Sequence, residues 1–372
     1  MRYYIIAGER SGDLHGSNLI KELSKRDKDA DFRVWGGDLM KKTGATLVKH
    51  IDELAFMGFI EVARNLNTVL KNLKLCKQDI LQYKPHAIIF IDYPGFNLRI
   101  ASFAKKHHIK TIYYISPQVW AWHQSRVKKI KRDIDMMLVI LPFEKDFFNK
   151  YDYATTFVGH PLLDALNEYE RSLTSIDFRM KNGLSDKPII AVLPGSRIQE
   201  ISKMLSIMTD ITDQFPHYQF VIAGVSAHQK SFYEKFIRNT NISIVFEQTY
   251  TLLYNAKAAL VASGTATLET ALIGIPQVVC YKANHLSYII AKKLVDINYI
   301  SLVNLIMDKQ VVKELIQHEF NTSNLTRELD LILNNNDYRN NMIENYAILR
   351  KKLGGKGASA TAASCIMNFL NQ

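Results

Sequence analysis

Cysteine is scarce in this chain, with only Cys76, Cys280 and Cys365 among 372 residues. Their odd number and wide spacing predict neither a disulfide framework nor a metal cage, and favour a reducing, cytoplasmic compartment with all three thiols in the core. Long apolar runs are absent as well, so we expect no membrane span. The opening apolar run breaks at Gly8 without a cleavage signal, which argues against a signal peptide.

Acidic residues are outnumbered: 36 Asp and Glu face 47 Lys and Arg, a net charge of +11. The basic residues form no known nucleic-acid-binding module, so no nucleic acid partner is expected. Two interpretations stay open, an ordinary solvated surface and attraction to anions such as phosphorylated substrates or an acidic membrane. The densest basic segment, residues 126–132 (RVKKIKR), alternates with apolar positions as an amphipathic helix does.

Short apolar runs alternate with helical stretches along the chain, a pattern typical of buried parallel strands. The series is interrupted after Gly159-His160-Pro161, a predicted hinge. We therefore expect an α/β fold of two doubly wound parallel-sheet, Rossmann-like domains, 1–165 and 166–350. Residues 351–372 are expected to form a helix that packs on the first domain or on a partner subunit. The predicted strands are 3–7, 32–35, 87–91, 111–115 and 137–141, then 189–193, 219–223, 242–246, 258–262 and 277–281.

Two strand-to-helix turns in the second half suit a nucleotide-sugar. LPGSR (193–197) and SGTATLE (263–269) each close a predicted strand, and the second helix is expected over 267–273. Helix N-termini attract phosphate, Arg197 adds a charged fork, and Glu269 is placed to chelate a ribose diol. Each turn alone is also an ordinary connection; their combination predicts the site. The donor-binding residues predicted here are Gly195, Ser196, Arg197, Ser263, Gly264, Thr265, Thr267 and Glu269.

The segment AGERSGDLHG (7–16) follows the first predicted strand and is expected to form a loop at the substrate site. Its glycine spacing lacks the GxGxxG pattern of dinucleotide-binding turns, so we reject that reading. His15 has two interpretations, a substrate contact and a helix-face residue satisfied by a neighbour. The predicted acceptor or cleft residues are Gly8, Glu9, Ser11, Gly12, Asp13 and His15.

Asp92 directly follows an apolar run and is expected at the carboxyl end of a central strand. A carboxylate there would accept the proton of an attacking alcohol, so we interpret Asp92 as a general base. The alternative is a carboxylate that caps the next helix. Pro94 and Gly95 intervene, however, and Asn97 is better placed to cap a helix over 98–107.

The segment FMGFI (56–60) is too apolar for an ordinary loop and has basic residues nearby. One interpretation is peripheral attachment to an anionic membrane, and the other is a buried helix face. The predicted membrane or acyl-chain contacts are Phe56, Met57, Phe59 and Ile60. Trp120 and Trp122 likewise have two readings, core packing and lining of the substrate cleft.

Taken together and in order, these motifs resemble those of lipid-A-disaccharide synthases. The resemblance also rests on the segments 91–97 (IDYPGFN), 114–132 (YISPQVWAWHQSRVKKIKR), 141–148 (LPFEKDFF), 157–164 (FVGHPLLD), 56–62 (FMGFIEV) and 299–306 (YISLVNLI). It implies a GT-B fold, with two domains facing a cleft, and an inverting glycosyltransferase that needs no metal or cofactor. It also matches Asp92 to a functional aspartate and Asn304 to a polar position near the donor.

The reaction implied by the resemblance joins UDP-2,3-diacylglucosamine to the 6-hydroxyl of 2,3-diacylglucosamine 1-phosphate. The products would be the β-1,6 lipid A disaccharide 1-phosphate and UDP, in lipopolysaccharide biosynthesis. The expected location is the cytoplasm, peripherally at the inner face of the cytoplasmic membrane of a Gram-negative bacterium. A homodimer is left open.

Two other functions stay open. A nucleotide-sugar 2-epimerase would share the second-domain site but, with a soluble substrate, would have little use for the apolar segment 56–60. A lipid-binding or nucleotide-binding protein without chemistry would not require Asp92. Release of UDP in the presence of the diacyl acceptor separates both from the transferase.

Overall fold

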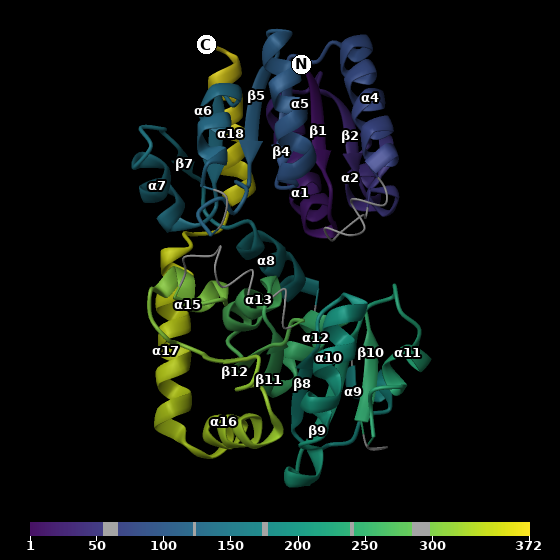
Figure 1. The fold of residues 1–372 in the computed structure, drawn as a ribbon, viewed down its shortest axis with the longest axis vertical. Helices are drawn as coiled ribbons and strands as arrows, with labels where there is room; N and C mark the ends of the chain where they lie inside the picture. The colour runs from purple at the N-terminus through teal and green to yellow at the C-terminus, as the bar shows by residue number, and fades with distance from the viewer. Residues whose placement is uncertain (55–65, 122–123, 173–177, 239–241, 285–297) are drawn as a thin grey trace. The chain divides into compact units, whose positions relative to one another are not determined.

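Both halves of the chain fold as parallel sheets with helices packed on their faces (Figure 1). The computed structural model describes residues 1–54, 66–121, 124–172, 178–238, 242–284 and 298–372. It divides into two units, Met1–Asp164 with Leu353–Gln372, and Ala165–Lys352. The predicted α/β class, two doubly wound parallel sheets, is confirmed. Among the described residues, no helix is both long enough and apolar enough to cross a bilayer.

The first unit contains a seven-stranded sheet in the order β3-β2-β1-β4-β5-β6-β7. The chain runs outward from β1 in one direction and from β4 in the other, so the strand order reverses between these two neighbours. The segments that follow β1 and β4 therefore lead to helices on opposite faces of the sheet, and ligands of open α/β sheets bind beside such a reversal at the carboxyl edge. The strands are β1 (Arg2–Ala7), β2 (Asp31–Gly36), β3 (Thr46–His50), β4 (Ala87–Ile91), β5 (Lys110–Tyr114), β6 (Met136–Val139) and β7 (Thr156–Phe157).

Alternate residues of these strands point to two different helix layers. Tyr4, Ile6 and Phe90 belong to a core shared with α4, α5 and α6, whereas the Tyr3 hydroxyl contacts Asp27, after α1, and Met367 in α18. The helices are α1 (Arg10–Arg26), α2 (Asp38–Lys42), α4 (Leu66–Tyr83), α5 (Pro94–Lys106), α6 (Arg126–Asp133), α7 (Pro142–Asn149), α8 (Leu162–Ser172), which spans the unit boundary, and α18 (Ala358–Leu370), with the short 3-10 turn η1 (Ile51–Glu53).

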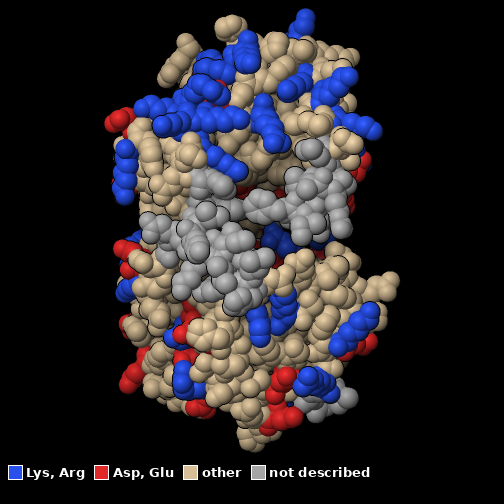
Figure 2. All heavy atoms as spheres, viewed as in Figure 1, with Lys and Arg blue, Asp and Glu red and all other residues tan. Residues whose placement is uncertain are grey.

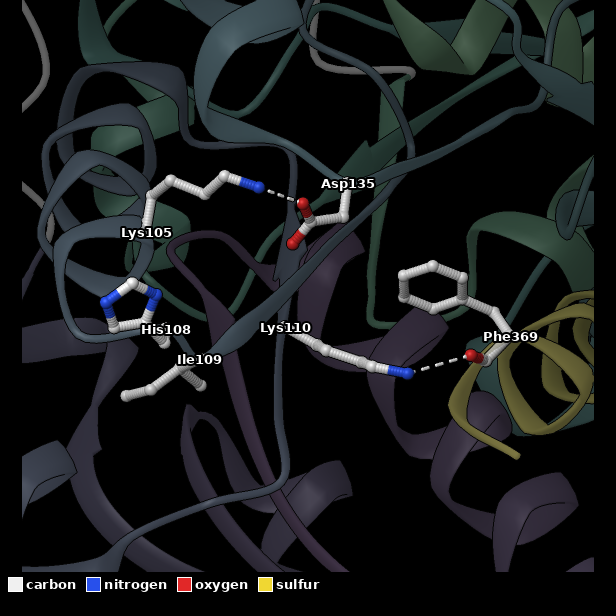
Figure 3. Close-up of a pocket in the computed structure, with 6 residues that line it drawn as sticks. All are labelled: Lys105, His108, Ile109, Lys110, Asp135 and Phe369. Carbon is white, nitrogen blue, oxygen red and sulfur yellow. Dashed lines mark hydrogen bonds and ion pairs between the residues drawn. The ribbon is translucent and has the colours of Figure 1, made fainter. Parts of the chain in front are cut away.

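The last helix, α18, returns to the first unit and packs along α1. Arg26 donates to Ser364 at 3.2 Å, and Lys110 donates to the Phe369 carbonyl at 3.1 Å. Figure 3 shows this second contact in a cavity near the amino end of β5, where Lys105 also pairs with Asp135. Both lysines that line the cavity are thus engaged within the protein.

The second unit contains a six-stranded sheet in the order β10-β9-β8-β11-β12-β13, which reverses between β8 and β11. The strands are β8 (Ile189–Leu193), β9 (Gln219–Gly224), β10 (Ile242–Phe246), β11 (Ala256–Ala262), β12 (Gln277–Tyr281) and β13 (Lys313–Ile316). The helices are α9 (Phe178–Asn182), α10 (Ile198–Thr209), α11 (Lys230–Glu234), α12 (Thr249–Tyr254), α13 (Thr265–Ile273), α15 (Leu302–Met307), α16 (Thr322–Asn334) and α17 (Asn336–Lys352), with the 3-10 turn η3 (Thr212–Gln214).

Every predicted strand is present, within a few residues at its ends, but several helices begin earlier than predicted. The segment expected as a loop over 7–16 is mostly helix, because α1 begins at Arg10. Asn97 does not cap α5: the helix begins at Pro94, after Tyr93. Cys76 and Cys280 are buried as predicted, whereas Cys365 is half-buried.

Candidate active site

The loops that follow β1 and β4 touch each other at the carboxyl edge of the first sheet. Gly8 follows β1, and a Cβ built on it would lie 2.3 Å from the Tyr93 ring. The ring therefore lies directly against the Gly8 backbone, and it also stacks on Phe96 at 5.5 Å between centroids. This contact places Glu9 and Asp92 at the same edge of the sheet, and Glu9 is one of the charges that act on Asp92.

Asp92 lies at the end of the central strand, as predicted, and its backbone is unusual. Asp92 has φ 41° and Tyr93 has φ 49°, so two consecutive non-glycine residues adopt the left-handed conformation. Burial, reinforced by the charges of Glu9 and Glu144, raises the pKa of Asp92 to about 7. A carboxyl group with that pKa can both accept and release a proton near neutral pH.

Glu144 is a carboxylate that the sequence reasoning missed. It is 1% exposed, and it accepts hydrogen bonds from the Ser116 hydroxyl, from Trp120 Nε1 and from the backbone N–H groups of Ile140 and Leu141. Burial raises its pKa to about 7 against the opposing effect of these donors. A signal was available: Glu144 is the third residue of α7, from which its side chain accepts the backbone N–H of Leu141, the residue before the helix. Trp120 packs in the core, one of its two predicted roles, and Trp122 lies outside the described residues.

Two of the predicted acceptor residues, Asp13 and His15, are buried in the first turns of α1. The Asp13 carboxylate is buried and accepts the backbone N–H groups of Gly37, Leu39 and Met40 at 2.7–3.0 Å, which anchors the first turn of α2. His15 is buried, and burial lowers its pKa to about 4, so it is neutral at pH 7. The Asp13 carboxylate is thus engaged within the protein, whereas His15 Nδ1 has no hydrogen-bond partner among the described residues; the substrate roles of both residues stay predictions.

The remaining residues of this segment divide in the same way. Gly12 is buried, and Ala7 and Ile91 pack against it. Ser11 is exposed and Glu9 is half-buried, and both lie in or beside the first turn of α1. Gly8, Glu9 and Ser11 are therefore the predicted residues that the structure leaves at the carboxyl edge.

In the second unit, the turn after β8 carries the LPGSR motif. Gly195 has φ 96°, and a Cβ there would lie 2.4 Å from Glu200 Oε2, so the turn requires glycine. Arg197 is the N-cap residue of α10; its guanidinium is 60% exposed and lies 3.3 Å from Glu200 Oε1. His228, which sequence reasoning missed, lies 3.0 Å from the Ser196 carbonyl. The turn thus presents a cation beside the N-terminus of a three-turn helix.

The turn after β11, next to β8 in the sheet, carries the second motif. Gly264 and Thr265 are exposed where α13 begins, and the Ser263 hydroxyl donates to the Ile300 carbonyl. Glu269 accepts a hydrogen bond from the Tyr250 hydroxyl at 2.8 Å, and burial raises the pKa of Glu269. Both predicted donor turns therefore flank the point where the strand order reverses.

Two further predicted donor residues, Thr267 and Asn304, are fully buried. Thr267 is fully buried and its hydroxyl donates to the Gly264 carbonyl. Asn304 is fully buried; its amide group donates to the Val312 carbonyl and to Glu314, and accepts the backbone N–H groups of Val311 and Val312. Both side chains are thus engaged within the protein, as that of Glu269 is, and their roles in donor binding stay predictions.

The predicted membrane contacts Phe56, Met57, Phe59 and Ile60 lie outside the described residues. Near them in sequence, α4 exposes Leu70, Leu75 and Leu81, with fractional exposures of 42–54%. Figure 2 shows lysine and arginine side chains gathered on the first unit, around α5 and α6. The exposed basic residues of these helices are Arg99, Lys105, Lys106, Lys128, Lys131 and Arg132.

Solved structures with the same fold include nucleotide-sugar enzymes. The UDP-GlcNAc 2-epimerase from Neisseria meningitidis, bound to UDP-GlcNAc, matches with a TM-score of 0.69 and 14% identity, covering 99% of this chain and 100% of its own. The S. aureus MnaA–UDP co-structure matches with a TM-score of 0.72 and 13% identity over 100% and 97% of the two chains. A glycotransferase of kitacinnamycin matches with a TM-score of 0.70 and 14% identity over 99% of both chains. The likeness confirms the GT-B type of fold.

Sequence comparison is more specific. Residues 3–367 match the model of the lipid-A-disaccharide synthetase family. The lipid-A-disaccharide synthase of Syntrophus aciditrophicus is 37% identical over 99% of this chain and 97% of its own, and that of Trichlorobacter lovleyi is 34% identical over 100% and 98%. The enzyme of Coxiella burnetii is 36% identical over 98% of both chains. The chain therefore belongs to the lipid-A-disaccharide synthase family of glycosyltransferases.

Proposed function

We propose that the enzyme joins the diacylglucosamine unit of UDP-2,3-diacylglucosamine to the 6-hydroxyl of 2,3-diacylglucosamine 1-phosphate. The observation that carries this proposal is Asp92, a carboxyl group with a pKa of about 7 at the strand-order reversal of the first unit. Family membership supplies the substrate class. The products are the β-1,6-linked disaccharide 1-phosphate and UDP.

In the proposed step, Asp92 removes the proton of the acceptor hydroxyl while its oxygen attacks the anomeric carbon of the donor. The bond from that carbon to the diphosphate oxygen breaks, and UDP leaves with the bonding electrons. Because attack and departure occur on opposite faces, the anomeric configuration inverts. The raised pKa supports this role, since a general base is most effective when its pKa lies near the working pH.

Donor binding is assigned to the second unit, broadly residues 166–350. Arg197 is expected to neutralise the diphosphate, including the charge that grows on departing UDP. The backbone of Gly195, Ser196, Ser263, Gly264 and Thr265 would add N–H donors beside the N-termini of α10 and α13. Glu269 would hold the ribose. Support comes from the two turns lying on adjacent strands, β8 and β11.

Acceptor binding is assigned to the first unit, broadly residues 1–165, through Gly8, Glu9 and Ser11. The same unit is proposed to attach peripherally to the inner face of the cytoplasmic membrane, with Phe56, Met57, Phe59 and Ile60 as its apolar contacts. Electrostatics support this: burial, followed by the like charges of neighbouring arginines such as Arg132, lowers the pKa of Lys129 against the opposing charge of Asp133. Such crowding favours an anionic surface, at about 1 kcal/mol per basic residue.

Release of UDP from the diacyl donor, with and without the diacyl acceptor, tests the proposed reaction. We expect release that depends on the acceptor, with a disaccharide as co-product; release without acceptor would point to an epimerase-like or hydrolytic enzyme.

Flotation with anionic vesicles tests attachment. Phe56→Ser with Phe59→Ser should release the protein without unfolding it, whereas Lys230→Glu, an exposed change in the second unit, should leave binding unchanged.

A further inference from the structure

The backbone carbonyl of Asp92 accepts two hydrogen bonds from buried side chains of different elements. One comes from the hydroxyl of Tyr113 in β5, and the other from Asn97 Nδ2 in α5 at 2.7 Å. Both donors are 0% exposed. On the other side of the same residue, the Asp92 N–H donates to the Ile115 carbonyl at 3.2 Å. The Asp92 backbone is therefore fixed at both its N–H and its C=O.

These contacts oppose a conformational cost. Each non-glycine residue in the left-handed region costs on the order of 1–2 kcal/mol, and Asp92 and Tyr93 both lie there, so nearby contacts must hold them. The left-handed turn changes the direction in which the Asp92 side chain leaves the strand. A relaxed, extended residue at this position would point its carboxylate elsewhere.

We propose that Tyr113, together with Asn97, is a positioning residue that aims the Asp92 carboxylate at the acceptor hydroxyl by holding the Asp92 carbonyl. This inference rests on the proposed function, in which Asp92 is the base. Tyr113 is the better probe of the two, because Asn97 also donates to the carbonyls of Ile6 and Ile91 and so ties neighbouring strands together.

The test is Tyr113→Phe, which removes one hydroxyl and keeps the ring that packs on Phe90. Misplacing a catalytic group by about 1 Å costs up to about 100-fold in rate, so we expect kcat to fall on the order of 10-fold or more. KM for donor and acceptor should change less than about twofold, since the hydroxyl touches neither substrate.

Tyr153→Phe is the matched control. The Tyr153 hydroxyl also donates to a backbone carbonyl of the first unit, that of Ile134, at 3.0 Å. Both variants should lose similar stability, because each loses one hydrogen bond, but only Tyr113→Phe should lose turnover. Wild-type kcat in Tyr113→Phe, or failure of that variant to fold, would overturn the inference and leave the hydroxyl a structural group.

A double variant separates this inference from the proposed function. In the Asp92→Asn background, adding Tyr113→Phe should leave the residual kcat unchanged, because the carboxylate that Tyr113 aims is gone. An equal loss in both backgrounds would contradict the positioning role while leaving Asp92 as the base. Near-full turnover in Asp92→Asn alone would instead remove the base and the proposed mechanism.

Discussion

The ionisation of Asp92 should make the free energy of unfolding depend on pH. Its pKa is raised to about 7 from the usual 3.8, so between these two values the native state binds more protons than the unfolded state. The contribution of Asp92 to the free energy of unfolding therefore falls as pH rises between these two values. We expect Asp92→Asn to raise the free energy of unfolding at pH 8 by about 1–3 kcal/mol and to have little effect near pH 4. Denaturant unfolding at both pH values measures this, and equal effects at both would contradict the raised pKa.

The same ionisation predicts the pH dependence of the rate. Because the base must be unprotonated, kcat/KM should rise about tenfold per pH unit below about pH 7 and level off above it. Glu144, with a pKa also raised to about 7, interacts with Asp92, so the rising limb belongs to the pair. Glu144→Gln should move the limb to lower pH, because it removes a neighbouring negative charge. An unmoved limb would show that the two carboxyl groups act independently.

Glu269 is predicted to act in binding and not in turnover. A ribose contact is the same in the ground state and the transition state, so Glu269→Gln should raise the donor KM about 10-fold or more with kcat nearly unchanged. Steady-state kinetics measure this split. Glu328→Gln is the control, since Glu328 likewise accepts a tyrosine hydroxyl, that of Tyr338, within the second unit. A fall in kcat with unchanged KM would contradict the ribose role.

Helices and strands were predictable where the hydrophobic pattern of the sequence was strong, but the strands at most edges of the two sheets were not. The strands missed were β3, β7 and β13, which form edges of the two sheets and have half-exposed or very short sequences. The start of α1 was misplaced because glycines were read as loop, whereas Gly12 packs closely on Ala7. The phase of α1 also decides that Asp13 and His15 are buried, which a loop prediction does not indicate.

The junction of β1 with α1 can be tested through Gly8. A methyl group at this position would overlap the Tyr93 ring, so Gly8→Ala should cost about 1–3 kcal/mol of stability and also lower kcat by displacing Asp92. Gly95→Ala is the control: nothing lies within 4 Å of a Cβ built there, and the residue is helical. It should be neutral or stabilising by up to about 1 kcal/mol. A Gly8→Ala protein with normal Tm and kcat would show that the ring can move aside freely.

Across the chain, the return of α18 makes the first unit depend on the last residues. Ile366 is fully buried, whereas Thr361 on the same helix is exposed. Ile366→Ala should destabilise the first unit by about 2–4 kcal/mol, with Thr361→Ala near zero. Hydrogen exchange should show faster exchange in α1 and β1 and little change in the second unit. Equal loss of protection in both units would mean that they unfold together.

The sequence predicted that a terminal helix would pack back on an earlier part of the chain, and left open whether its partner was the same subunit. The sequence did not indicate which residues α18 contacts. Arg26 and Lys110 donate hydrogen bonds to residues of α18 that lie more than 250 positions away in sequence. Similarly, the sequence indicated Asp92 as the base but not Tyr113, because a tyrosine in an apolar strand is also an ordinary core residue. Pairings of this kind depend on strand order, which local patterns do not encode.

The position of α18 also has a consequence for the order of synthesis. A ribosome makes the first sheet early, yet the face that α1 shares with α18 stays uncovered until residues 358–370 emerge. The nascent first unit must therefore wait, incomplete, while the whole second unit is translated. During that interval its stability rests on the seven-stranded sheet and the helices α1, α2, α4, α5, α6 and α7, and α18 completes the unit only after residues 165–352 have been made.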